Sequence, residues 1–186
     1  NKGFTQATGD IMAWSNTDDV YLPDALWTVG SVFQALPRVD WLTSLWKVQW
    51  DENSREVNRY RVKGFSRKAF YRGRNLLGSN PYASFMIQQQ STFWRRELWD
   101  RAGGRVDDTL DLAGDFELWG RFYQHADLYG TVSMLGGFRV QKNQRTQQKA
   151  LYKAEAEYIL RHIQSGYGWS PDQIRQLALR CKLHIM

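Results

Sequence analysis

Apolar residues fall into short runs and alternating patterns that predict several strands. Ile11 to Trp14 is a brief apolar run that ends at polar turn formers, which is typical of a buried strand. Trp46, Val48 and Trp50 alternate with Lys47, Gln49 and Asp51, so this segment predicts a half-buried strand with the polar side chains facing solvent. Turn formers at 51–54 and a returning stretch at 57–62 complete a hairpin, and a further strand is expected at 128–133, leading to the segment 136–140.

Other segments repeat their apolar residues at helical spacing. Leu26, Val29, Phe33 and Leu36 share one face of a helix that Pro37 ends. The first eight residues resemble the end of a helix closed by Gly9. Further helices are expected at 97–102, from 115 onward, at 147–163 and, after a capping box at Ser170, toward Cys181. Strands and helices interleave, so the chain is predicted to be α/β.

A polar segment, Ser15 to Asp19, follows the first predicted strand directly. It places Asp18 and Asp19 where a strand ends in a loop, a position from which carboxylates hold a hard divalent cation, which in turn binds a diphosphate. Pro23 fits the first position of the next helix, with Asp24 in its first turn. The alternative is that the two acids only form a turn and cap that helix.

Two later strings also contain candidate chemistry. In Ile87 to Arg96, polar residues precede Phe93 and Trp94, which look like strand-end residues and also fit a plain edge strand. In Leu112 to Phe122, Asp115 stands at a helix start beside Gly114, where the helix dipole favours its ionised form. On position alone, Asp115 is equally well explained as a helix cap.

Together, the three strings resemble family-2 glycosyltransferases with the GT-A fold. Asn16-Thr17-Asp18-Asp19, followed by Tyr21 and Pro23, resembles the family's Asn-Ser-Asp-Asp-x-Tyr-x-Pro string, which carries its "DxD" element. The resemblance runs from Asn1 to about Thr146 and implies a Rossmann-like mixed sheet flanked by helices. Residues 1–146 would then be a partial GT-A domain whose N-terminal nucleotide-binding strands precede Asn1, and residues 147–186 would be amphipathic helices.

The resemblance also implies a reaction, the transfer of a sugar from a nucleotide-diphospho-sugar to an acceptor hydroxyl with inversion. In the family, the Asp of Asp-x-Asp/Glu-Leu-Trp-x-Arg deprotonates the acceptor, and Asp115 matches it, with Gly114 where the family often has Glu. Asp18 matches the ligand of Mn²⁺ or Mg²⁺, while Asn16 replaces the first acid of the element. Gln141 stands where the family commonly has a metal-binding histidine.

Further contacts follow from the same resemblance. The acceptor side of the cleft would be lined by Gln89, Gln90 and Arg95, with Trp94 as an aromatic wall or, alternatively, a core residue. The donor would be bound by Asn16, Asp18, Asp19 and Arg145, with Arg145 and Lys142 stabilising the leaving diphosphate. The expected acceptor is a carbohydrate or lipid-linked molecule in bacterial polysaccharide or glycolipid synthesis. Without the strands before Asn1, the chain alone is expected to show little or no transfer, and a catalytically inactive glycosyltransferase fragment is an alternative reading.

Charge adds a competing hypothesis. Lys and Arg number 25 against 19 acids, and this surplus of +6 suits nucleotide diphosphates, phospholipid surfaces or nucleic acid. Basic residues at 63–74 alternate with Phe65, Phe70 and Tyr71, as in a nucleic-acid-binding module, but also as in a solvated basic face over an aromatic core. Docking to an anionic acceptor or to lipid headgroups is a third option. Nucleic acid is the less favoured partner, because Asp18, Asp19 and the start of the Asp115 helix would repel phosphate in the absence of a metal.

Cys181 is the only cysteine, which excludes an internal disulfide or a cysteine zinc site. The sequence has neither an apolar run of membrane-spanning length nor a signal-peptide pattern. These features predict a cytoplasmic location, with basic surface available for peripheral contact at the inner face of the membrane. The two amphipathic C-terminal helices suit packing or pairing with another subunit, which leaves a homo-oligomer open.

Overall fold

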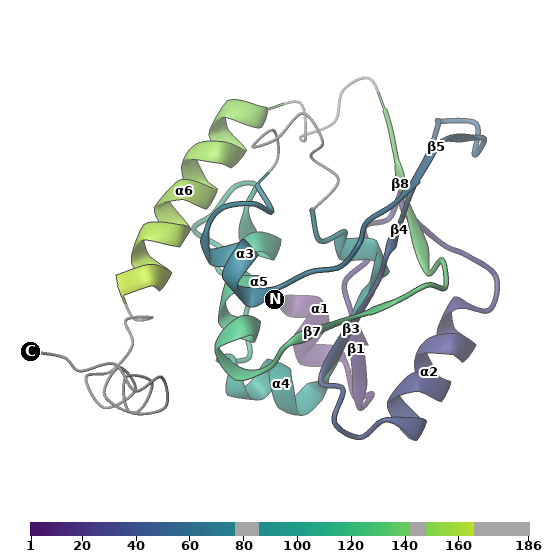
Figure 1. The fold of residues 1–186 in the computed structure, drawn as a ribbon, viewed down its shortest axis with the longest axis horizontal. Coiled ribbons are helices and arrows are strands. Elements are labelled where there is room, and N and C mark those ends of the chain that lie inside the picture. Colours follow the sequence, from purple (N-terminus) through teal and green to yellow (C-terminus); the bar gives the residue numbers. More distant parts are fainter. Residues whose placement is uncertain (77–85, 142–147, 166–186) are drawn as a thin grey trace, which may run out of the picture.

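The computed structural model describes residues 1–76, 86–141 and 148–165, and in these the chain is a mixed α/β fold with two four-stranded sheets flanked by helices (Figure 1). The first sheet has the order β1 (Ile11–Ala13), β6 (Thr92–Arg95), β3 (Trp41–Ser44) and β7 (Leu128–Thr131). The second has the order β2 (Val20–Tyr21), β8 (Gly136–Arg139), β4 (Trp46–Trp50) and β5 (Glu56–Arg61). In each sheet one pair is parallel, the outer pair β3 with β7 in the first sheet and the central pair β8 with β4 in the second, and the other pairs are antiparallel.

The helices are divided between two sides of the first sheet (Figure 1). One side carries most of them, α5 and α6 included, and the other carries α2. Their bounds are α1 (Lys2–Gln6), α2 (Ala25–Ala35), α3 (Arg67–Tyr71), α4 (Arg96–Arg101), α5 (Gly114–His125) and α6 (Lys149–Ser165), with a 3-10 turn η1 (Gln89–Ser91) before β6. Within the described residues, no helix is both long and apolar enough to cross a bilayer.

The larger core is built from aromatic rings between the first sheet and α5. Trp41, Trp94 and Trp119 are fully buried, and the Trp41 and Trp119 rings stack with centroids 5.6 Å apart. Much of the heavy aromatic load of the sequence is therefore core. The α6 helix belongs to the same core through its buried stripe (Tyr152, Ala156, Ile159), which confirms the packing helix predicted at 147–163. The helix predicted toward Cys181 lies outside the described residues.

The smaller core lies under α2, and here the predicted face of the helix is partly wrong. The helix buries Ala25, Val29 and Phe33 against Phe93 and Leu135, because residues four apart form one stripe. Two residues of the predicted face are instead exposed, Leu26 at 62% and Leu36 at 42%. The predicted helix start is also displaced, since Asp24 is the N-cap, in a left-handed conformation with φ 62°, and helical residues begin at Ala25.

The predicted hairpin is confirmed, because β4 and β5 pair antiparallel around a turn at 51–54. The prediction that the Lys47 side chain faces solvent is wrong, because this side chain is only 1% exposed. The strand lies between β8 and β5, so both of its edges are paired, and the Lys47 ammonium lies over the Phe65 ring, 4.9 Å from its centre. The adjacent strand β3 has no counterpart in the predicted elements, because all four of its residues are buried and its sequence shows no alternation.

The basic segment at 63–74 is a solvated face over aromatic core. Its α3 helix buries Phe70 and Tyr71, while Lys63, Lys68 and Arg72 are exposed. The strand predicted at 128–133 is confirmed as β7, and the segment 136–140 that follows it contains β8, a strand of the other sheet.

Candidate functional site

The loop after β1 holds the acidic pair, as predicted from the sequence. Asp18 and Asp19 are both half-buried, whereas Asn16 is exposed. The Asp19 carboxylate accepts hydrogen bonds from the Arg139 backbone N–H at 3.3 Å and from the Asn16 side-chain amide at 3.2 Å. Burial raises the pKa of Asp19, and the neighbouring Asp18 raises it further against the opposing effect of these bonds. The Asp19 carboxylate is therefore held in place by hydrogen bonds within the protein, and the Asp18 carboxylate makes fewer such bonds.

Arg139, at the end of β8, fastens this loop to the β4–β5 hairpin. Its Nε donates to the Asp18 carbonyl oxygen at 2.8 Å. Its Nη1 donates to the carbonyl oxygens of Asp51 at 3.0 Å and Glu52 at 3.3 Å, both in the hairpin turn. One guanidinium thus fixes the backbone of the acidic loop, a role that sequence reasoning missed. The available signal was the position of Arg139 in the string where the family has Arg-x-His.

The predicted metal ligands lie next to each other. The Gln141 side-chain amide nitrogen lies 3.5 Å from Asp18 Oδ2, and rotation of the amide would turn its oxygen toward the same point. No group of three or more His, Cys, Asp or Glu side chains able to hold a metal occurs in the described part of the chain. A carboxylate and an amide are hard oxygen donors that suit Mg²⁺ or Mn²⁺, so the residues fit a cation whose remaining ligands come from a diphosphate and water. Arg145 and Lys142 lie outside the described residues.

The candidate base, Asp115, lies at the other end of the site, in the first turn of α5. Its side chain borders a narrow crevice together with Ile87, Phe116 and Tyr152. Burial raises the pKa of Asp115 to about 6, and the hydrogen bond from the Phe116 N–H at 2.7 Å opposes this only in part. The sequence-based expectation that the helix start would keep this acid weakly basic is therefore corrected, since burial outweighs the helix terminus.

The chain between residues 87 and 89 joins the two ends of the site. Ile87 borders the Asp115 crevice, and Gln89 donates from Nε2 to the Trp14 carbonyl oxygen at 3.2 Å and to Asn16 Oδ1 at 3.4 Å. Two residues of extended chain span at most about 7 Å. Asp115 and the acidic loop therefore face the same short segment, although they are far apart in the sequence.

The α6 helix holds the approach to Asp115. The Glu155 carboxylate accepts three consecutive backbone N–H groups, from Asp111 at 3.0 Å, Leu112 at 2.9 Å and Ala113 at 2.8 Å. These residues lead directly into α5. Tyr152, one turn earlier on α6, is buried, and its pKa is raised well above the usual value by burial and by the charge of Asp115. In the sequence, Glu155 lies outside the apolar stripe of α6. Nothing in its position along the chain indicates that it binds the backbone N–H groups of residues 111–113.

The four predicted acceptor contacts separate into two groups. Gln89 reaches the acidic loop, and Gln90 is only 3% exposed, with a side-chain nitrogen that has no hydrogen-bond partner among the described residues. Trp94 is fully buried in the larger core, the alternative left open for it. Arg95 donates from Nε to the Val39 carbonyl oxygen at 2.9 Å and from Nη2 to the Phe33 carbonyl oxygen at 2.6 Å, so its guanidinium binds the end of α2. The structure therefore brings Gln89 to the acidic loop, places Trp94 in the core and Arg95 at the end of α2, and leaves the role of Gln90 a prediction.

Two glycines on β8 allow close packing beside the acidic loop. A Cβ at Gly136 would collide with the Gln90 carbonyl oxygen, and a Cβ at Gly137 would collide with the Trp50 indole nitrogen. Trp50 therefore lies directly over the Gly137 backbone, two residues before Arg139. Nothing in the sequence pattern of 136–140 indicated that these two positions require glycine.

Comparison with known proteins adds no assignment, since the chain matches no family model and no curated protein sequence matches it. The functional argument is therefore based on the three motifs and on the geometry of the residues that they contain.

Proposed function

We propose that this chain carries the diphosphate-binding loop and the catalytic base of an inverting glycosyltransferase of GT-A type, which uses a nucleotide-diphospho-sugar. The observation that supports this most directly is the segment 87–89, which contacts the acidic loop through Gln89 and borders the Asp115 crevice through Ile87. A metal-ligand candidate and a base candidate thus flank one stretch of chain. The mixed sheets flanked by helices are consistent with this fold.

The proposed reaction is a single displacement at the anomeric carbon. The acceptor hydroxyl oxygen attacks this carbon from the face opposite the diphosphate, and Asp115 takes its proton. The bond between the anomeric carbon and the diphosphate oxygen breaks, and that oxygen keeps the electron pair. With a pKa raised to about 6, Asp115 is mostly ionised at neutral pH and is a stronger base than an exposed aspartate.

The donor side is assigned to the acidic loop. Asp18 and Gln141 would hold Mn²⁺ or Mg²⁺, which neutralises charge on the leaving diphosphate. Asn16 and Asp19 keep the loop in shape through their mutual hydrogen bond. The contribution of Arg145 to the diphosphate stays a prediction.

The acceptor side is assigned to Gln89 and Gln90. Gln90 is buried and has a donor group without a partner among the described residues, which suits it to bind a hydroxyl group at the base of a cleft. A carbohydrate or lipid-linked acceptor in polysaccharide or glycolipid synthesis fits this chemistry.

The test is thermal unfolding with Mn²⁺, with uridine diphosphate, and with both. Because the protein offers few metal ligands of its own, we expect the melting temperature to rise most when both are present. Asp18→Ala should abolish this rise, whereas Asp100→Ala, at an exposed acid on α4, should retain it. An equal rise in the Asp18 variant, or a rise with oligonucleotide and none with any nucleoside diphosphate, would refute the proposal, and the second result would favour a polyanion-binding module.

A further inference from the structure

The positive charge of this chain is concentrated in one segment. Residues 55–74 contain eight Lys or Arg and one acid, Glu56. This segment therefore carries more than the entire surplus of +6, and the rest of the chain is close to neutral with a slight excess of acid. Such segregation predicts a single surface that attracts anions, rather than a generally basic protein.

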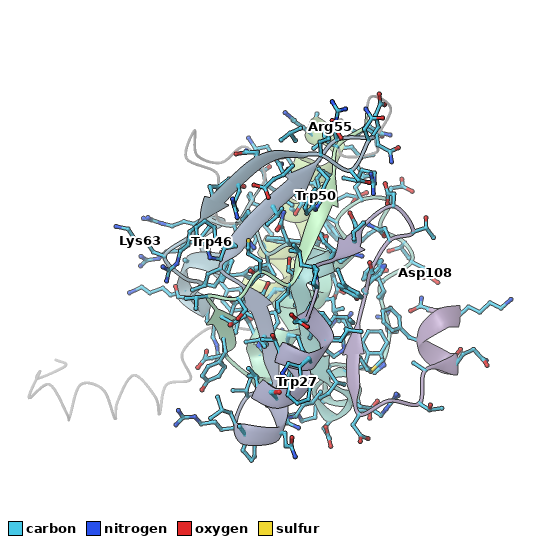
Figure 2. All side chains as sticks on the ribbon, turned by 90° about the vertical axis from the view of Figure 1, so that its right-hand side faces the viewer. Trp27, Trp46, Trp50, Arg55, Lys63 and Asp108 are labelled. Atoms are coloured by element: carbon cyan, nitrogen blue, oxygen red, sulfur yellow. The ribbon has the colours of Figure 1, made fainter. Side chains whose placement is uncertain are left out.

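The first half of this segment lies on the outermost strand of the second sheet. Arg55, Arg59, Arg61 and Lys63 are all exposed, on β5 and on the residues that flank it. Arg61 pairs with Trp46 across the β4–β5 ladder, so the indole and the guanidinium are neighbours on one side of the sheet. Figure 2 shows Arg55 at the top of the view, and Trp46 and Lys63 toward its left side. We call these five residues, Trp46 with the four cations, the basic face.

Exposed apolar side chains adjoin the basic face. Val57, on β5 itself, is 55% exposed. On α2, which lies on the same side of the molecule in both views, Trp27 is 76% exposed and Leu26 is 62% exposed (Figures 1 and 2). Tryptophan beside aliphatic groups and cations is the composition that proteins present to the headgroup region of a bilayer.

We infer that the basic face, together with Trp27 and Leu26 of α2, docks onto the surface of an anionic phospholipid membrane. Cations on the face meet the negative headgroups, and the exposed apolar groups enter the interfacial layer. Single-stranded nucleic acid is the poorer match, because it binds through exposed rings on which bases stack. In the second half of the segment, Phe70 and Tyr71 are buried in the core and Phe65 is half-buried beneath Lys47.

Docking would also place the candidate site near the membrane. The basic face ends at the hairpin turn, and Arg139 binds the carbonyl oxygens of Asp51 and Glu52 in this turn and that of Asp18 in the acidic loop. If the proposed transferase function holds, this arrangement favours an acceptor that is itself embedded in the membrane through a lipid. This last step rests on the proposed function, but the docking does not.

The experiment is cosedimentation of the full chain with phosphatidylcholine vesicles, with and without about one third phosphatidylglycerol. We expect binding only to the anionic vesicles, with loss of binding at high salt. Each cation near such a surface contributes about a fivefold factor in affinity, so Arg61→Glu with Lys63→Glu should weaken binding by about 25-fold or more. Trp27→Ser should weaken it as well. The matched control is Lys149→Glu with Arg161→Glu, at exposed cations of α6 on the other side of the molecule (Figure 1).

Several outcomes would overturn the inference. These are equal binding to neutral and anionic vesicles, equal weakening by the α6 control pair, or tight oligonucleotide binding with no vesicle binding. The assay contains neither metal nor nucleotide, so its result is independent of the test with Mn²⁺ and uridine diphosphate. If the protein binds vesicles but its melting temperature does not respond to Mn²⁺ and uridine diphosphate, the membrane-docking inference stands and the proposed transferase function is refuted.

Discussion

Lys47 offers a sharp test of the packing described above, because its ammonium group is buried without a carboxylate partner among the described residues. Its nearest polar contact is the Ser44 carbonyl oxygen at 3.4 Å, and it lies 4.9 Å from the centre of the Phe65 ring. Burial lowers the pKa of Lys47 from 10.5 to about 7. Replacement by methionine, which is unbranched, keeps most of the length of the side chain and removes the charge, should therefore stabilise the protein at neutral pH.

The magnitude follows from this pKa change. One pH unit corresponds to about 1.4 kcal/mol, so the protonated form is penalised in the folded state by about 5 kcal/mol. Loss of the contacts with Ser44 and Phe65 offsets part of the gain, which leaves about 3 kcal/mol for Lys47→Met. This penalty applies in full below pH 7, where Lys47 is protonated in both the folded and the unfolded state. Between pH 7 and 10.5 the unfolded chain holds the proton and the folded chain releases it, so the stability of the wild type rises with pH.

The assay is urea unfolding at several pH values between about 6 and 9.5, followed by tryptophan fluorescence. The free energy of unfolding of the wild type should rise across this range, by up to about 1.4 kcal/mol per pH unit. The curve for Lys47→Met should begin higher and be flatter. Lys63→Met, at an exposed lysine just beyond the same hairpin, should follow the wild type. Parallel curves for the wild type and Lys47→Met, or destabilisation by this variant at pH 6, would refute the reasoning.

Two further predictions concern the candidate site. In a protein that contains the complete GT-A domain, Asp115→Asn should remove sugar transfer but keep the melting shift with Mn²⁺ and uridine diphosphate. The rate of transfer with Asp115 intact should fall as the pH drops through about 6, where the pKa of Asp115 lies, because the base becomes protonated; unchanged transfer in the variant would exclude Asp115 as the base. Glu155→Gln should lower the free energy of unfolding by about 1–3 kcal/mol, because the single amide oxygen of glutamine cannot accept hydrogen bonds from all three backbone N–H groups. The control is Glu157→Gln, at an exposed glutamate on the same helix, and equal urea midpoints for the two variants would contradict this prediction.

The elements that the sequence predicted correctly are those whose signal is local. The strand at 11–13 is a short apolar run between polar residues, and the β4–β5 hairpin has alternation on both sides of a turn. The α5 and α6 helices carry their apolar residues at helical spacing. In each case the pattern of apolar and polar residues within a short segment indicates which side chains are buried.

The errors come from positions where a distant partner decides burial. The α2 sequence has apolar residues on more than one face, and the helix buries the stripe of Val29 because Phe93 and Leu135 lie opposite it. Lys47 has the polarity of a surface residue, but it is buried, with its ammonium group against the ring of Phe65, a residue 18 positions further along the chain. β3 is buried on both faces, so its residues do not alternate and its pattern is not that of a half-buried strand.

The candidate site shows the same division. The motifs identified Asp18, Asp115 and Gln141, and the structure places Gln141 beside Asp18. The residues that hold them in place were not found, because Glu155 acts 42 to 44 positions from its partners and Arg139 acts 121 positions from Asp18. Only three-dimensional contacts join such pairs, and a single sequence does not contain them.

From the hydrogen bonds of Arg139 we also expect a particular order in which parts of the protein fold. Its guanidinium joins segments near residues 18, 51 and 139, so these bonds close some of the longest loops in the chain and form only after β8 has joined β4. The acidic loop should therefore take its shape late, when the second sheet is complete. Conversely, local opening of that sheet would release the loop, and slow amide exchange at Asp19, whose N–H donates to the Asn16 carbonyl oxygen at 3.2 Å, would report that the two open together.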